Sequence, residues 1–283
     1  MQTDKFKKII FHNDKFKAQI IQDCFMFYHN IGIQPFSVLP DIQSASEIIL
    51  LDKGYKLIHI PMKSEEIGAV MLRLDGCNYV VLNTSRNVAY NNFAVAHELY
   101  HILIQKDNTK SFDILTDEYT DDPNEMMANA FAGNIMMPDD NFTFVYDSVI
   151  KSLRNLYHEK SSDFFDEYFT VIMLMNYFKT TYMSVVVRCF ETGKFDNRND
   201  ELISNLILNN NKNALAGLCS TYASYMGINT ISEISYKDDF NIFLEDAQRK
   251  GHDNIQKGLL SKKDLEYRLE GMKKAYEEVV REQ

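Results

Sequence analysis

The chain has 283 residues, 45% of them hydrophobic and 25% charged, which is ordinary for a globular protein with one large domain or two modest ones. Its formal net charge of −10 argues against general binding to nucleic acid or anionic membranes, because both favour basic protein surfaces. We therefore expect neither a direct nucleic-acid partner nor a membrane partner.

The first part of the chain predicts helices followed by a small sheet. Residues 5–30 carry apolar side chains at helical spacing, which predicts one or two helices. From Tyr55 onward, the segments "YKLIHIP", "IGAVMLRL" and "NYVVLN" are short and rich in β-branched residues. They predict a small antiparallel sheet, in which Asp75 and Gly76 form a hairpin turn.

Helices are expected over most of the remaining chain. The first spans about 91–105 and leads into the polar segment "KDNTKSFDILTDEYTDD", which predicts a connecting loop. A second helix begins at Pro123, with Asp122 as its N-cap, and ends before Pro138. The final helix is capped by Ser261. Further helices are predicted near residues 142–156, 163–178 and 181–191.

The polar stretch "ETGKFDNRND" is the best candidate for a boundary between regions. It divides the chain into residues 1–194 and a mostly helical region of residues 195–283, whose role the sequence does not indicate. Together with the small sheet, this pattern predicts an α+β protein.

The cysteines and the N-terminus indicate a cytoplasmic location. The four cysteines form no CxxC pair, so reduced thiols are expected rather than a disulfide framework or an all-cysteine zinc site. The first residues alternate charged and apolar side chains and contain no uninterrupted apolar run typical of a signal peptide.

Two histidines and a glutamate interrupt the apolar run "VAHELYHILI" at residues 95–104. Helical residues four apart lie roughly 40° apart on one face, so His97 and His101 present both imidazoles to one point. Neutral imidazole is a good zinc ligand. Glu98 lies roughly 100° round from His97, where its carboxylate can reach a water on the same metal and act as general base. The apolar flanks predict a buried helix, in which a metal would satisfy these polar groups.

A catalytic zinc needs a third protein ligand and an open position for water. Glu125 is preferred, because it leads an apolar stripe on the helix from Pro123, where Ala128 and Ala132 would allow close approach to the first helix. The helix dipole alone would also favour an acid in this first turn. Four acidic residues of the preceding segment are rivals, although such residues usually face solvent: Asp117, Glu118, Asp121 and Asp122.

The stretches "NNFAVAHELYHIL" and "NEMMANAFAGNIMMP" resemble the two central motifs of the ImmA/IrrE family of zinc metallo-endopeptidases. The first motif is matched by Phe93, Ala96, His97, Glu98, Leu99 and His101. The second motif is matched by Glu125, Ala128, Asn129, Phe131, Ala132, Met137 and Pro138. The sheet resembles the family's as well, through Gly68 and "VVLN", and so does the downstream segment "YFKTTYMSVVVRCFETG" with Arg188.

The resemblance implies a zincin-like metallopeptidase fold, in which the HExxH helix packs on the small sheet. It implies one zinc ion per chain, bound by His97, His101 and Glu125, with Glu98 as the general base. Manganese or iron would suit the same ligands. It also implies action in the cytoplasm on a protein substrate, typically a helix-turn-helix repressor.

Some positions depart from the family pattern. Tyr100 stands where the family commonly has glycine. Thr180, Thr181 and Cys189 stand where the family often has Val, Ser and Leu. Residues 195–283 have no counterpart in the resemblance. These departures leave the predicted zinc site intact and leave the substrate open.

A zinc peptidase often stabilises the oxyanion with a second donor besides the metal. Tyr100, Tyr119 and Arg188 are candidates, although each also has a structural role available to it.

We predict a zinc-dependent endopeptidase, a hydrolase that cleaves a peptide bond with metal-activated water and acts in regulatory proteolysis of a repressor-type transcription regulator. Residues 1–194 would form the metallopeptidase domain. Two alternatives stay open: a regulatory protein-binding module that retains the zinc site, or a toxin or effector of a two-gene system. The sequence predicts no particular oligomeric state.

Overall fold

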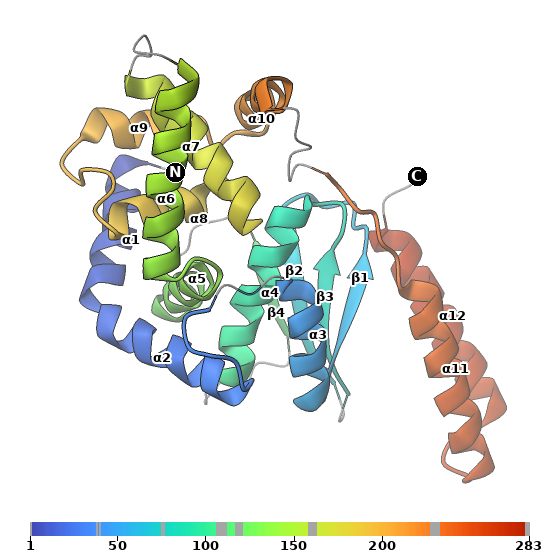
Figure 1. The fold of residues 1–283 in the computed structure, drawn as a ribbon. Helices are drawn as coiled ribbons and strands as arrows, with labels where there is room; N and C mark the ends of the chain where they lie inside the picture. The colour runs from blue at the N-terminus through green and yellow to red at the C-terminus, as the bar shows by residue number, and fades with distance from the viewer. Residues whose placement is uncertain are drawn as a thin grey trace.

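The computed structural model describes residues 2–37, 39, 41–74, 77–105, 112–116, 121–157, 163–226 and 233–280. The fold is α+β, as predicted (Figure 1). Along the chain, helices both precede and follow the strands of the sheet. The chain begins with the helices α1 (Thr3–Lys15), α2 (Lys17–Asn30) and α3 (Ile42–Asp52). The apolar spacing within residues 5–30 therefore belongs to two helices, α1 and α2.

The sheet has four strands in the order β1-β3-β2-β4. Their bounds are Tyr55–Ile60 for β1, Ile67–Leu74 for β2, Cys77–Asn83 for β3 and Phe112–Thr116 for β4. Strand β2 runs antiparallel to β3, as expected, and also antiparallel to β4. Strand β1 runs parallel to β3, so the sheet is mixed and the prediction of a wholly antiparallel sheet is wrong. The predicted turn at Asp75 and Gly76 lies outside the described residues.

The parallel pairing arises because β3 lies between β1 and β2. The connection from β1 to β2 reverses the chain and passes the end of β3, where the Asn83 side chain holds it. The Asn83 Oδ1 atom accepts from the Met62 backbone N–H at 2.9 Å, and its Nδ2 donates to the carbonyls of Ser64 at 2.7 Å and Ile67 at 2.8 Å. These bonds connect Asn83 with residues 62–67, which are distant from it in the sequence. A local sequence pattern therefore does not predict the parallel pairing.

Strand β4 was not expected, since residues 106–122 predict a loop. It is five residues long and pairs along β2, for example Ile114 with Val70. A segment of this length carries no clear alternation of apolar and polar residues, so its pairing with β2 decides its structure.

The predicted helices after the sheet are present. Their bounds are Val88–Leu103 for α4, Pro123–Met136 for α5, Asp139–Tyr157 for α6, Asp163–Phe178 for α7 and Tyr182–Glu191 for α8. Asp122 caps α5 as predicted, its carboxylate accepting from the Asn124 N–H at 2.8 Å. Helix α4 begins a few residues earlier than expected because the Asn87 side chain caps it, accepting from the Tyr90 N–H at 2.8 Å.

Helix α4 lies between the sheet and α5 (Figure 1). One core combines the inner sheet face, including Met71 and Leu82, with Val95 and Leu99 of α4 and Phe131 of α5. The predicted burial of the HExxH helix is confirmed, since its residues from Ala94 to His101 are all buried. Helix α4 is therefore packed against apolar side chains of the sheet on one side and of α5 on the other.

The described residues after 194 form the helices α9 (Asp200–Leu208), α10 (Lys212–Met226), α11 (Phe240–Gln256) and α12 (Lys262–Val279). Helix α9 contacts α1, and α10 contacts α7. Helices α11 and α12 form a hairpin beside β1, with α12 capped by Ser261 as predicted (Figure 1). The division into residues 1–194 and 195–283 as separate domains stays a prediction.

A short segment before α11, residues 233–239, crosses the strand ends and the start of α4. The first helical N–H of α4, that of Val88, donates to the Glu233 carbonyl at 3.0 Å. Thr84 Oγ1 donates to the Lys237 carbonyl at 2.6 Å, and the Asp239 N–H donates to the His59 carbonyl at 2.9 Å. This segment therefore fastens the C-terminal hairpin to the element that carries the HExxH residues.

Among the helices that the structure describes, none combines the length and apolarity needed to cross a membrane.

Candidate metal centre

Helices α4 and α5 pack closely and bring the three predicted ligands together. Ala128 and Ala132, the small residues predicted to face α4, are completely buried, so the two helix backbones approach each other. Glu125 lies in the first turn of α5, and His97 and His101 lie one turn apart on α4.

The potential ligand atoms of His97, His101 and Glu125 all lie within 4.8 Å of one another. His97 Nε2 is 3.0 Å from His101 Nε2 and 3.2 Å from Glu125 Oε2. The other carboxylate oxygen, Glu125 Oε1, is 3.5 Å from His101 Nε2. Two imidazole nitrogens and one carboxylate around a single point are a donor set that can hold a metal ion, and one that suits zinc.

The outer nitrogens of both histidines have amide partners. His97 Nδ1 is 2.9 Å from Asn129 Oδ1, and His101 Nδ1 is 2.6 Å from Gln105 Oε1. An amide oxygen only accepts, so each Nδ1 carries a hydrogen and each Nε2 of a neutral ring presents a lone pair. Two such lone pairs and a carboxylate converge without a donor among them, which is unfavourable unless a cation lies between them. The residues present therefore fit a metal ion.

The electrostatics of the site favour positive charge at this point. Burial alone would raise the pKa of Glu125, but His101 and His97 donate to this carboxylate whenever their rings carry a proton on Nε2 as well, and these hydrogen bonds then hold the pKa of Glu125 well below its ordinary value. Burial alone would lower the pKa of His101, but the hydrogen bond with Glu125 and the charge of Glu98 raise it instead. The Glu125 carboxylate thus stays ionised and attracts a cation.

Glu98 is almost fully buried on α4, with 2% of its surface exposed. Its charge is felt at His101, which places the carboxylate near the ligand cluster without making it part of that cluster. This position agrees with a base that acts on a water at the metal and not on the metal itself.

The rival acidic residues divide into two groups. Asp121 and Asp122 are exposed, and Asp122 is used as the cap of α5. Asp117 and Glu118 lie outside the described residues. Within the part of the chain that the structure describes, Glu125 is the acid that joins the two histidines.

The candidate oxyanion donors have different surroundings. Arg188 is buried, and its guanidinium donates to the Met137 carbonyl at 2.9 Å and to Glu191 Oε2 at 2.6 Å, and it also pairs with Asp139. These contacts give Arg188 a structural role at the end of α5. Tyr119 lies outside the described residues.

Tyr100, the departure at the centre of the motif, is buried. Its ring centroid lies 5.7 Å from that of His101 and 5.5 Å from that of Phe131 on α5. Burial raises the pKa of its hydroxyl. The ring therefore packs between α4 and α5, beside the predicted metal ligand His101, and fills the interface of the two helices.

Two residues of the site were not predicted to act in it. Gln105 follows His101 by one helical turn, and Asn129 follows Glu125 by one turn. This spacing is the signal that could have suggested both as partners of the histidines. Sequence places Asn129 on the stripe of Glu125, but only the structure shows which ring nitrogen it contacts.

Residues 52–190 match the family model described as the IrrE N-terminal-like domain, a family of peptidases. The matched range contains His97, Glu98, His101 and Glu125, together with the whole sheet. No curated protein matches the chain.

Proposed function

We propose that this chain, whose residues 52–190 belong to the ImmA/IrrE family of metallopeptidases, is a zinc-dependent endopeptidase. The observation that carries this proposal is the convergence of His97, His101 and Glu125, with both histidines oriented by amide side chains. Family membership supports peptidase chemistry, and the donor set supports zinc as the metal.

The division of roles follows from the contacts. His97, His101 and Glu125 would hold the ion, while Asn129 and Gln105 keep both imidazoles in the tautomer that offers Nε2. A zinc ion bound there would polarise the scissile carbonyl and lower the pKa of a water.

Glu98 would perform the proton transfers. Its carboxylate would take a proton from the attacking water and pass it to the leaving amine, as general base and then general acid. Its burial removes competing water from the carboxylate and keeps it beside the ligand cluster. The packing of α4 between α5 and the sheet keeps these groups in fixed positions.

We propose a repressor-type transcription regulator with a helix-turn-helix domain as the substrate, with cleavage in the cytoplasm. Support for the substrate comes from the resemblance of the two central motifs. Support for the compartment comes from Cys24, Cys189 and Cys219, which are buried free thiols suited to a reducing environment.

Glu98→Gln tests the proposed function. The variant keeps the shape of the side chain and removes its basicity, so it should bind zinc as the wild type does and lose cleavage by at least about 100-fold. Cleavage is measured by mass spectrometry on a helix-turn-helix repressor encoded by a neighbouring gene. The matched control is Glu47→Gln on α3, away from the ligand cluster.

If Glu98→Gln cleaves as fast as the wild type, Glu98 is not the base. If the biological effect of the protein persists in the variant while cleavage is lost, the protein-binding alternative is favoured. If cleavage is found on a target other than a repressor, the toxin or effector alternative is favoured.

A further inference from the structure

Helix α2 presents to solvent a face without acidic or strongly basic side chains. Its one acid, Asp23, is buried, and its one lysine, Lys17, is its first residue. The exposed positions that follow are apolar, amide or histidine residues, among them Ala18, Ile21, Gln22, Phe25, Met26 and His29. A surface helix normally turns charged residues to water, and this composition is instead typical of a helix that is covered on both sides.

Five large apolar side chains make up the exposed surface, which we call the α2 face. Three belong to α2 and two to the turn that follows it: Ile21, Phe25, Met26, Ile33 and Phe36, each between 37% and 48% exposed. The turn continues the surface of the helix, because the Ile33 N–H donates to the Tyr28 carbonyl at 3.1 Å and the Phe36 and Tyr28 rings lie 5.8 Å apart. Exposed apolar residues gathered in this way mark an interaction site.

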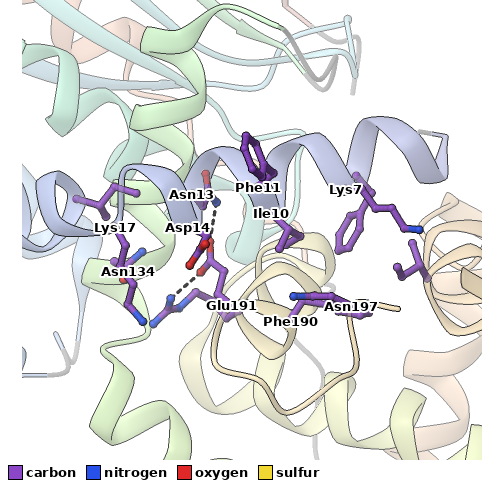
Figure 2. Close-up of a pocket in the computed structure, with 14 residues that line it drawn as sticks. Lys7, Ile10, Phe11, Asn13, Asp14, Lys17, Asn134, Phe190, Glu191 and Asn197 are labelled. Carbon is purple, nitrogen blue, oxygen red and sulfur yellow. Dashed lines mark hydrogen bonds and ion pairs between the residues drawn. The ribbon is translucent and has the colours of Figure 1, made fainter. Parts of the chain in front are cut away.

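The helices that carry the α2 face are fixed to the rest of the fold. The inner side of α2 packs on α5, where the Tyr28 hydroxyl donates to the Ile135 carbonyl at 3.0 Å. Helix α1 leads directly into α2 and is fastened to the end of α8, since Asn13 Nδ2 donates to Glu191 Oε1 at 2.6 Å (Figure 2). A partner therefore meets a preformed surface and loses little free energy in ordering it.

The charge of the α2 face favours a second copy of the chain as its partner. The chain carries a net charge of −10, so most of its surface repels another copy, whereas this face has no acid to do so. Apolar faces depleted of charged residues are typical of contacts between identical subunits. The same net charge disfavours an anionic membrane as the partner.

An antiparallel arrangement of two α2 helices also matches the charges at the helix ends. Lys15 and Lys17 are exposed at the start of α2, and the Lys17 pair with Asp139, at 3.9 Å, is exposed and weak. Across a two-fold axis, both lysines of one copy lie beside the C-terminal end of the other α2, where the helix dipole is negative.

The area of the α2 face suits a dimer of moderate affinity. At roughly 200 Å² for a large side chain, five side chains exposed to about two fifths present on the order of 400 Å² per copy, or about 800 Å² for two. A specific interface buries at least roughly 1,200 Å², so neutral neighbours such as Gln22 and His29 supply the remainder. We expect a dissociation constant on the order of 10 μM.

We propose that the α2 face binds the same face of a second copy, so that the chain forms a two-fold dimer with antiparallel α2 helices. The two-fold axis passes close to Gln22 and Phe25, which lie nearest the middle of the exposed side of α2. The face lies outside residues 52–190, and this inference does not depend on the proposed peptidase activity.

Sedimentation velocity of the full chain from about 1 to 200 μM tests the dimer, because association depends on protomer concentration. We expect the mass to rise from 32.9 kDa toward twice that value and to stop there, since a two-fold contact is closed. A chain that stays monomeric at every concentration, or that assembles without limit, overturns the proposal.

Phe25→Glu locates the interface. It brings two carboxylates together at the axis and should weaken dimerisation at least about tenfold. Gln22→Glu, at an exposed polar position that supports no core contact, should act in the same direction. The matched control is Ile242→Glu on α11, which is more exposed at 68% and should dimerise as the wild type does. Normal dimerisation of both α2 variants, once circular dichroism shows that they are folded, places the interface elsewhere.

Mixing Phe25→Glu with Phe25→Lys tests the two-fold pairing itself. Each variant alone should be mainly monomeric, and an equal mixture should recover a dimer of one copy of each, because opposite charges then meet at the axis. A mixture of folded variants that associates no better than either alone contradicts the antiparallel pairing.

Vesicles of phosphatidylglycerol separate the dimer from membrane binding by the same face. We expect the wild-type chain to remain in the supernatant when the vesicles are sedimented. Co-sedimentation of the wild type that is lost in Phe25→Glu, together with a monomer in solution, would assign the face to a membrane and overturn the proposal.

Discussion

The histidines of the metal centre are oriented by neutral amides, Asn129 for His97 and Gln105 for His101. A neutral acceptor selects the tautomer of the ring and adds no further negative charge beside Glu98 and Glu125. Both contacts are short, at 2.9 Å and 2.6 Å, and both come from residues one turn beyond a ligand. The orientation of both histidines therefore depends on Asn129 and Gln105, which are not themselves predicted to bind the ion.

Asn129→Ala should weaken zinc binding by about 10- to 100-fold, because His97 loses the partner that fixes its tautomer and orientation. The dissociation constant for zinc is measured by competition with a chelator of known affinity. Asn124→Ala, an exposed position in the first turn of the same helix, is the control and should bind zinc normally. Unchanged affinity in Asn129→Ala would show that the hydrogen bond does not support the ligand.

At the scale of elements, the position of α4 on the sheet depends on a close approach between β2 and the ring of Tyr90. A Cβ atom at Gly68 would lie 2.4 Å from Tyr90 Cε1, which no side chain could occupy without displacing the ring. The Tyr90 ring is also held by the guanidinium of Arg86, 3.8 Å from its centroid. The absence of a side chain at Gly68 thus allows α4 to pack on the sheet with His97 and His101 facing α5.

Gly68→Ala should lower the free energy of unfolding by about 1–3 kcal/mol, because the added methyl group overpacks the contact with α4. Denaturant unfolding measures the change. Tyr90→Ala in the same chain should remove most of this penalty, and a double-mutant cycle gives the coupling. Additive effects of the two substitutions would show that the Tyr90 ring is not what excludes a side chain at position 68.

The elements that sequence predicts well are those with local signals. Helix α5 has a cap at Asp122, a proline at its first position and a proline after its end, and its interface with α4 follows from Ala128 and Ala132. Strand β4 and the parallel pairing of β1 depend on partners distant in the chain, which no local pattern specifies.

The same distinction applies to the site. His97, His101 and Glu98 share one helix, so helical geometry alone relates them. Sequence favours Glu125 as the third ligand because of its apolar stripe, although acids in the connecting segment compete with it. The structure sets Asp122 apart, because this residue is exposed and caps α5. The one-turn spacing of Gln105 from His101 and of Asn129 from Glu125 is only a weak signal, because the structure is needed to show which ring nitrogen each amide contacts.

At the scale of the whole molecule, residues 233–239 join the C-terminal hairpin to the sheet and to the start of α4. The link includes buried His59, whose Nδ1 atom lies 2.6 Å from Oδ2 of the half-buried Asp239. The same carboxylate oxygen accepts from the His59 backbone N–H at 3.1 Å. Phe243 of α11 packs on the outer sheet face against Tyr79, with ring centroids 5.3 Å apart. The hairpin is therefore connected to the sheet and to α4.

Protonation of His59 should weaken this connection. Burial is the main cause that lowers the pKa of His59 below 6.5, although the hydrogen bond with Asp239 opposes the shift. The unfolded chain then binds a proton more readily than the folded chain, so the contribution of His59 is intact above about pH 6.5 and is lost as the pH falls below it.

The melting temperature of the wild type should therefore fall more steeply between about pH 7 and pH 5.5 than that of His59→Gln. His252→Gln, an exposed histidine on α11, is the control and should keep the slope of the wild type. Identical slopes for His59→Gln and the wild type would contradict the assigned role.

We propose that α4 and α5 together form one zinc site. The metal content of the purified chain tests this site most directly, measured by inductively coupled plasma mass spectrometry after equilibration with zinc and removal of excess. We predict one tightly bound zinc per wild-type chain, the same for Asp121→Ala, and loss of tight zinc from Glu125→Ala. A wild-type chain without zinc, or a Glu125→Ala chain that retains one equivalent, would contradict this account.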